Sequence, residues 1–125
     1  MDLNNMIVRC SDMDEAFEVL RLVEAYTDIT WVDNQSPIRG GECAWLEEQY
    51  LPTNTKIALF FKRYKANEKI RIYYRNEYMH YSGFIDDLRA ELKNPIIINL
   101  NDFAMLLRDM DKIIPSKDKL MDFLL

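Results

Sequence analysis

Residues 55–75 (TKIALFFKRYKANEKIRIYYR) constrain the fold of this chain more than any other stretch. They form two runs in which apolar and polar side chains alternate, joined by the polar segment 65–68. Period-two alternation is typical of strands with one buried face, so the sequence predicts a β-hairpin. Phe60 adds an apolar side chain to the second face of the first strand. We therefore expect that strand to lie centrally, with both faces covered.

The rest of the chain supplies the helices that an isolated hairpin needs in order to be stable. Strands are expected at 6–10, 29–32 and 96–100, and helices at 11–26, 42–51, 83–93 and 101–114, with a last short helix from Ser116. The apolar run 96–100 predicts a central, doubly covered strand. Segment 33–54 is otherwise irregular. Ser11, Ser82 and Asn101 are the expected N-caps.

This order of elements predicts an α+β fold. We expect a single domain over residues 1–125, with a mixed sheet of about five strands around a central hairpin. Helices pack on that sheet, and the C terminus is helical. The apolar residues near the end of the chain, among them Phe123, Leu124 and Leu125, are expected to dock on the domain or to contact a partner. A homo-oligomer formed through this C-terminal helix is one such outcome.

The composition is that of a globular protein. Of the 125 residues, 49% are hydrophobic, and no apolar run approaches the ~20 residues that cross a bilayer. The first residues do not have the pattern of a signal peptide. With only Cys10 and Cys43, a disulfide framework is not expected. These observations predict a cytoplasmic protein with reduced thiols and no membrane contact.

Charge is distributed unevenly along the chain. Residues 1–54 carry three basic and eleven acidic side chains (net −8), residues 55–81 seven and two (net +5), and residues 82–125 six and eight (net −2). The overall charge of −5 disfavours nucleic-acid binding. The acidic part predicts a binding face that imitates nucleic-acid charge against a basic protein groove. Its candidate residues are Asp14, Glu15, Glu18, Glu24, Glu47 and Glu48.

A second candidate surface combines basic and aromatic side chains. It consists of Arg71, Tyr73, Arg75 and Tyr78 from the hairpin region together with Trp45. Such residues can pair with acids of the first helix (Glu15, Glu18 or Glu24) within the same fold. They can also form a protein interface or bind a small anion or nucleotide. The sequence leaves these alternatives open.

No motif predicts catalysis, a metal or a cofactor. His80 is the only histidine, and Cys10 and Cys43 lack the spacing of a zinc site. Gly40-Gly41 lacks the residues of a phosphate-binding loop. An enzyme would have to be centred on His80 or Cys43, and the interpretation we favour for both is structural.

Four segments follow one another along the chain: MIVRCSDMDEAFEVL, ITW, KIALFFKRYKANEKIRIYY and IIINLNDF. This layout resembles that of small phage-encoded α/β accessory proteins. The resemblance implies an accessory protein that blocks a host factor by binding or sequesters a small signal, with no catalytic residues. Our first hypothesis is a non-enzymatic inhibitor from a phage or mobile element that binds a host defence protein through the acidic face. The alternative is a protein that binds or sequesters a small anionic ligand or nucleotide on the basic-aromatic face.

Overall fold

The computed structural model describes residues 3–47, 54–77 and 83–113. In this part of the chain the elements are β1 (Met6–Cys10), α1 (Met13–Tyr26), β2 (Thr30–Trp31), α2 (Pro37–Glu47), β3 (Ile57–Lys62), β4 (Arg71–Asn76), α3 (Phe84–Glu91), β5 (Ile96–Asn99) and α4 (Leu100–Ile113). The strands form one sheet in the order β2-β4-β3-β1-β5. The α+β fold expected from the sequence is confirmed.

The β3–β4 hairpin lies at the centre of this mixed sheet. Strand β3 is antiparallel to β1 and β4, whereas β5 is parallel to β1 and β2 is parallel to β4. The turn is closed by a hydrogen bond from the Glu68 amide to the Lys65 carbonyl (2.9 Å). Because β3 has a strand on each side and helices over both faces, its residues from Ile57 to Phe61 are almost fully buried. The central position predicted from Phe60 is confirmed.

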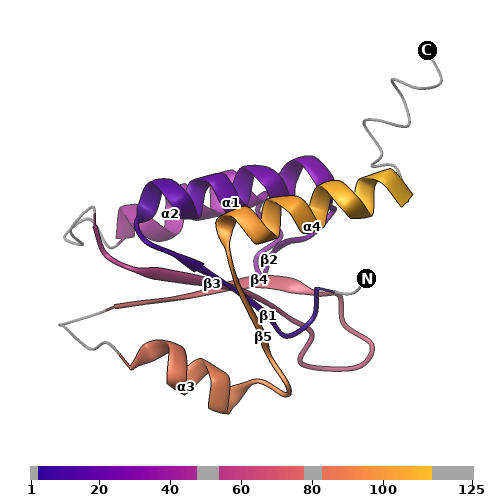
Figure 1. Ribbon diagram of the computed structural model, residues 1–125. Coiled ribbons are helices and arrows are strands. Elements are labelled where there is room, and N and C mark those ends of the chain that lie inside the picture. The colour runs from indigo at the N-terminus through magenta and orange to yellow at the C-terminus, as the bar shows by residue number, and fades with distance from the viewer. Residues whose placement is uncertain (1–2, 48–53, 78–82, 114–125) are drawn as a thin grey trace.

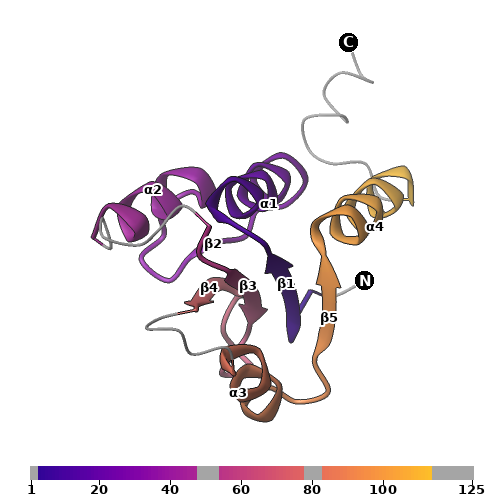
Figure 2. The same ribbon diagram turned by 60° about the vertical axis from the view of Figure 1, so that its left-hand side comes forward.

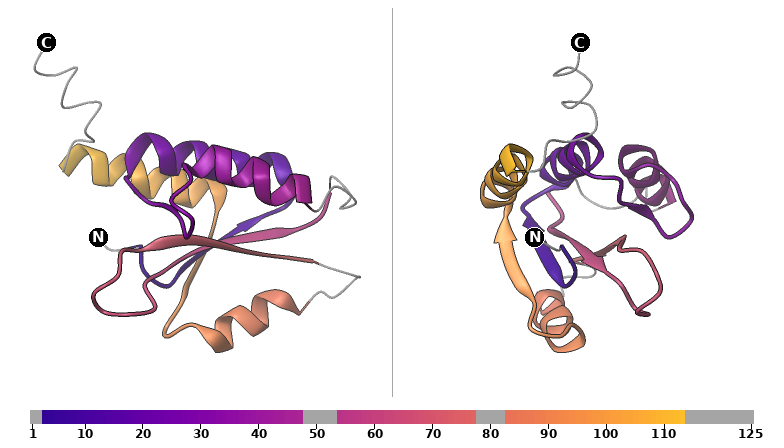
Figure 3. Two further views of the ribbon diagram at one scale, coloured as in Figure 1. Left: turned by 180° about the vertical axis from the view of Figure 1, so that it is seen from behind. Right: turned by 90° about the vertical axis from the view of Figure 1, so that its right-hand side faces the viewer.

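The helices form two layers of unequal size. Helices α1, α2 and α4 lie side by side over one face of the sheet, and α3 lies on the other (Figures 1 and 3). The connection β1–α1–β2 crosses the sheet in one direction and β4–α3–β5 crosses it in the other. Crossovers between parallel strands share one hand, so opposite directions place α1 and α3 on opposite faces.

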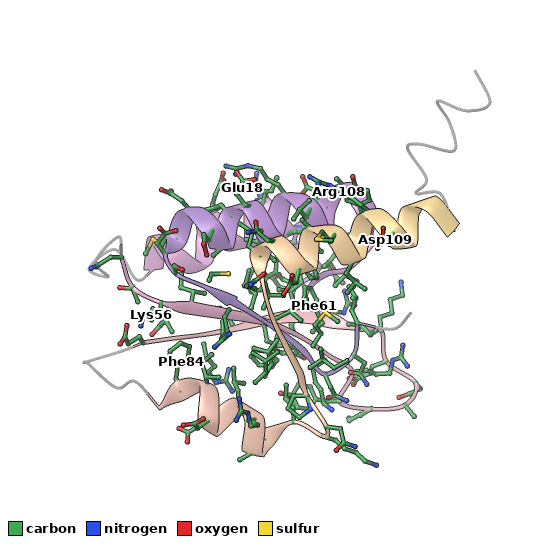
Figure 4. The ribbon with its side chains drawn as sticks, in the orientation of Figure 1. Glu18, Lys56, Phe61, Phe84, Arg108 and Asp109 are labelled. Carbon is green, nitrogen blue, oxygen red and sulfur yellow. The ribbon has the colours of Figure 1, made fainter. Side chains whose placement is uncertain are left out.

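Neighbouring phenylalanines on β3 belong to the two separate hydrophobic cores. Phe61 points into the larger core under α1 and α4, where its ring stacks on Phe103 with centroids 5.7 Å apart (Figure 4). Phe60 points into the smaller core under α3, with Phe84 and Leu88. Alternation along β3 thus supplies an anchor for each helix layer.

Strand β5 is an edge strand, which corrects the central position expected for 96–100. Among the described strands it pairs with β1 alone, in parallel register (Figure 2). Ile96 remains 56% exposed, and Ile97 and Ile98 are half-buried. A run of apolar residues marks a strand that packs on both sides, but it does not show how many strands flank it.

The helix starts also differ from those expected. Asp12, not Ser11, caps α1, and its carboxylate accepts the Glu15 amide hydrogen bond (2.9 Å). The Asn99 side chain, not that of Asn101, accepts the Asp102 amide at the start of α4 (2.9 Å). Helix α2 begins at Pro37, five residues before the expected start at 42.

The last short helix, expected from Ser116, lies outside the described residues. Within those residues, no helix has both the length and the apolar character needed to span a membrane.

Candidate functional site

The outer face of α1 carries most of the predicted acidic surface. Asp14, Glu18 and Glu24 of α1 are exposed, and Figure 4 shows Glu18 on the side of the helix turned away from the sheet. Arg21 forms an ion pair with Glu18. Helices α1, α2 and α4 together hold nine acidic and four basic residues, a net charge of −5. Residues 55–77, which form the hairpin and its flanks, hold seven basic and two acidic residues, a net of +5. The sheet and the helix layer therefore differ in charge.

Glu15 has a structural role besides its charge. Its carboxylate accepts a hydrogen bond from the Ser11 amide (3.0 Å), while its own amide donates to Asp12. This reciprocal arrangement satisfies amides that the first turn of a helix leaves unpaired. Glu47 is the last residue of α2, which also contains Trp45. Glu48 and Tyr78 lie outside the described residues, so these predictions are not tested.

The basic-aromatic face on β4 is engaged within the molecule. Tyr73 stacks on Phe60 (centroids 5.4 Å apart), and the Arg75 guanidinium lies 5.3 Å from the centroid of the same Phe60 ring. Arg75 also pairs with Glu91 of α3 (3.4 Å). Arg71 donates a hydrogen bond to the Thr30 hydroxyl. One of the alternatives, pairing with acids of α1, is not found in the described residues, because α1 lies over the opposite face of the sheet.

Tyr73 of this face and its neighbour Tyr64 both have a raised pKa. Burial raises the pKa of the Tyr64 hydroxyl above its ordinary value, and the charge of Glu91 raises it further. Burial also raises the pKa of Tyr73, where Glu68 adds to the effect and Arg71 opposes it. The two rings meet edge to face with centroids 5.3 Å apart. The neutral phenol is favoured in both cases, because burial penalises the charged form.

A shallow hollow of about 480 Å³ lies between β4 and α2. Tyr73, Arg75, Trp31, Val32 and Cys43 are among its lining residues. Val32 is 58% exposed, and Cys43 is an exposed, free cysteine. Two predicted ligand-binding residues, Tyr73 and Arg75, therefore border a concave surface.

A larger cleft, of about 640 Å³, lies where β1, β4 and β5 end. Its lining includes the last residues of β1 and β5 and the residue that follows β4. Residues from the first turns of α1 and α4 and from α3 complete it. Figure 4 shows Lys56 at this end of the sheet and Phe84 between the sheet and α3. The charged residues that line the cleft are Arg9, Lys56, Arg89, Glu15, Glu77 and Asp86.

The three basic residues of this cleft were not singled out by sequence reasoning. Arg9 is the one exposed residue of β1, whose other four residues are buried. Lys56 immediately precedes β3, and Arg89 belongs to α3. A lone arginine in an apolar strand is the only local signal. The other two join it through the fold.

The remaining reactive groups do not assemble a catalytic centre in the described part of the chain. Burial raises the pKa of the Cys10 thiol to about 12, so it is protonated at neutral pH. Cys43 is exposed on α2, in the layer of three helices. Within the described ranges, no group of three or more His, Cys, Asp or Glu is placed to hold a metal ion. His80 lies outside those ranges.

Comparison of the chain with known protein families, with curated proteins and with solved structures gives no match. Fold and surface therefore define its class. The chain is an α+β protein in which an acidic layer of three helices covers one face of a sheet whose central hairpin is basic, with a charged cleft at one end of the sheet.

Proposed function

We propose that this chain is a non-enzymatic binding protein that occupies a basic surface of a partner protein with the outer face of α1. The observation that carries the proposal is the outward position of Asp14, Glu18 and Glu24. Among the described residues, neither the Asp14 nor the Glu24 carboxylate has a hydrogen bond or an ion pair. Their charge is thus available to a partner, and a field of one sign accelerates association with a surface of the other.

The kind of partner follows from this chemistry and from the layout of the chain. A surface that normally binds nucleic acid is basic, and an acidic helix can compete for it. The resemblance to phage-encoded accessory proteins suggests a host defence protein as the target. We place this activity in the cytoplasm, in agreement with two free cysteines. The alternative, an anion on the hairpin face, has less support because Arg71 and Arg75 already contact Thr30 and Glu91.

Charge reversal tests the proposal. Bait protein carrying Glu18→Lys and Glu24→Lys is compared with wild type in affinity capture from bacterial lysate, followed by identification of the captured proteins. The control carries Glu68→Lys and Asp86→Lys, an equal change of charge on residues of the hairpin turn and α3. The expected partner is captured by wild type and control but not by the α1 variant.

Association kinetics with that purified partner then distinguish electrostatic steering from non-specific binding. The α1 reversal is expected to slow association by about tenfold or more at low salt, and added salt is expected to remove most of the difference. Association rates that are equal for wild type and the α1 variant would exclude the acidic face as the binding surface.

A further inference from the structure

The position of the large cleft follows from the topology of the sheet. Strands β1, β4 and β5 run in the same direction, so their carboxyl ends lie along one edge of the sheet. The chain leaves β1 and β5 toward the three-helix layer and leaves β4 toward α3. A crevice opens where connections depart to opposite faces, and in α/β sheets this is where ligands bind. The volume of about 640 Å³ is within the range of small-molecule sites.

The walls of this cleft present cationic groups from two sides. Arg9 projects from β1 beside Asn99 of β5, its partner in the parallel register, and Arg89 projects from α3. Both arginines and Lys56 are exposed, and none of their side chains has a hydrogen bond or ion pair with another described residue. This contrasts with the hairpin face, where Arg71 and Arg75 are engaged. The arginines of the cleft can therefore take an external anion without breaking an existing contact.

The geometry favours phosphate as that anion. Guanidinium groups form paired hydrogen bonds with phosphate or carboxylate oxygens. A planar carboxylate offers its oxygens in one plane, whereas a tetrahedral phosphate offers them to several walls. The start of α4 at Leu100 and Asn101 supplies a further wall, where the helix dipole favours negative charge. The Asp102 amide there is already bound by the Asn99 side chain, so it is not counted as a ligand-binding group.

The cleft also holds three carboxylates, which restrict what the rest of the ligand can be. Glu15 is occupied by the Ser11 amide. Glu77 lies opposite Lys56 just beyond the paired ends of β4 and β3, and its amide donates a hydrogen bond to the Lys56 carbonyl (2.9 Å). Asp86 lies in the first turn of α3. Carboxylates repel a second anionic group but accept hydrogen bonds from hydroxyls. A ligand that suits the whole cleft has one phosphate and a neutral part with hydroxyl groups.

We propose that the cleft binds a small phosphorylated metabolite that carries hydroxyl groups, of the sugar-phosphate class. Its phosphate lies between Arg9 and Arg89 at the start of α4, and its hydroxyls face Glu77 and Asp86. This site is separate from the outer face of α1, so either assignment can fail without the other.

Titration of the full chain with ribose 5-phosphate, followed by amide chemical shifts in NMR, tests the site. Saturable shifts are expected at residues 9–11 and 99–101. Ribose alone is expected to give none, and inorganic phosphate to bind more weakly. Arg9→Gln and Arg89→Gln should each weaken binding about tenfold or more, the loss expected for a charged hydrogen bond. Arg108→Gln, an equal loss of charge on the exposed side of α4, should change affinity less than about twofold.

Two further variants separate the parts of the proposal. Glu77→Gln should weaken ribose 5-phosphate but not inorganic phosphate, because only the sugar reaches that wall. Arg9→Lys keeps the charge and should retain part of the affinity. Such retention would show that the loss in Arg9→Gln is not caused by a change in folding. Absence of saturable shifts, or equal loss in Arg108→Gln, would overturn the phosphate site. Equal affinity for phosphate and ribose 5-phosphate would overturn the assignment of hydroxyl groups.

Discussion

Gly40 lies against the indole ring of Trp31, so closely that a Cβ atom at position 40 would be 2.0 Å from Trp31 Cδ1. The same indole donates a hydrogen bond from Nε1 to the Pro37 carbonyl (2.8 Å). Its ring meets Tyr74 edge to face, with centroids 6.1 Å apart. Trp31 therefore joins α2 to the sheet, and Gly40 is required for close approach and not for a turn.

Substitution of Gly40 should reverse the usual preference of a helix. At an exposed helical position, Ala stabilises by about 1 kcal/mol relative to Gly. Here the methyl group overlaps the indole, so Gly40→Ala is expected to lower the free energy of unfolding by roughly 1–3 kcal/mol, the usual cost of overpacking. Chemical denaturation followed by circular dichroism measures the change.

A double-mutant cycle identifies the cause of that loss. In a Trp31→Leu background the clash is absent, so adding Gly40→Ala should cost little or stabilise the protein. If Gly40→Ala costs as much in the Trp31→Leu background as it does beside the native tryptophan, the contact between Gly40 and Trp31 is not what requires glycine.

The buried thiol of Cys10 should make stability depend on alkaline pH. Burial, with smaller effects from Glu15 and Asp12, raises its pKa from 9.0 to about 12. Below about pH 9 the thiol is protonated in both folded and unfolded chains. Between pH 9 and 12 only the unfolded chain loses this proton, so folding is disfavoured as pH rises, by up to roughly 1.4 kcal/mol per pH unit.

The difference in unfolding free energy between wild type and Cys10→Ala isolates this effect. It should be constant below about pH 9 and then fall, because Cys10→Ala lacks the titrating thiol. Parallel curves for wild type and Cys10→Ala up to pH 12 would contradict the assignment.

Local patterns were sufficient to predict the centre of the fold. Alternation in 55–75 indicated the hairpin, and Phe60 indicated a doubly covered strand, because burial on both faces leaves a direct mark on the sequence. The edge position of β5 leaves no such mark, since Ile96, Ile97 and Ile98 would suit either a central or an edge strand. Helix caps were shifted by one or two residues because several adjacent side chains can accept the same amides.

The acidic face of α1 and the charged cleft also differ in how far the sequence could predict them. Asp14, Glu18 and Glu24 belong to one predicted helix and are near in sequence, so an acidic surface on α1 could be proposed from the sequence alone. The cleft joins residues separated by most of the chain, such as Arg9 and Asn99, through strand order. Strand order depends on tertiary packing, which spacing along one sequence does not reveal.

Glu91 should control the acidity of Tyr64 selectively. Its negative charge opposes ionisation of that hydroxyl, whereas Tyr73 is affected by Glu68 and Arg71. Glu91→Gln is therefore expected to lower the pKa of Tyr64 toward its ordinary value and to leave Tyr73 unchanged. Glu68→Gln should have the reciprocal effect. Titration of the ring carbons of both tyrosines by NMR measures the two pKa values, and a common shift would refute the separate pairings.

Loss of the exposed Arg75–Glu91 ion pair should change stability by less than about 1 kcal/mol.

Helix α4 should be held to the sheet by Phe103 and not by its exposed apolar residue. Phe103 is fully buried and stacks on Phe61 with an interplanar angle of 12°, whereas Met105 is 61% exposed on the same helix. Phe103→Ala removes a ring from a closed core and should cost about 3–5 kcal/mol. Met105→Ala, a matched truncation two residues away, should change stability by less than about 0.5 kcal/mol.

Hydrogen exchange locates the consequence of the Phe103 substitution. Protection of the α4 amides should fall more than that of β3, because the helix loses its anchor while the central strand keeps neighbours on both sides. A large loss of stability in Met105→Ala would instead mean that this exposed side chain is covered in solution. The C-terminal segment or a second copy of the chain would then be the first candidates for that contact.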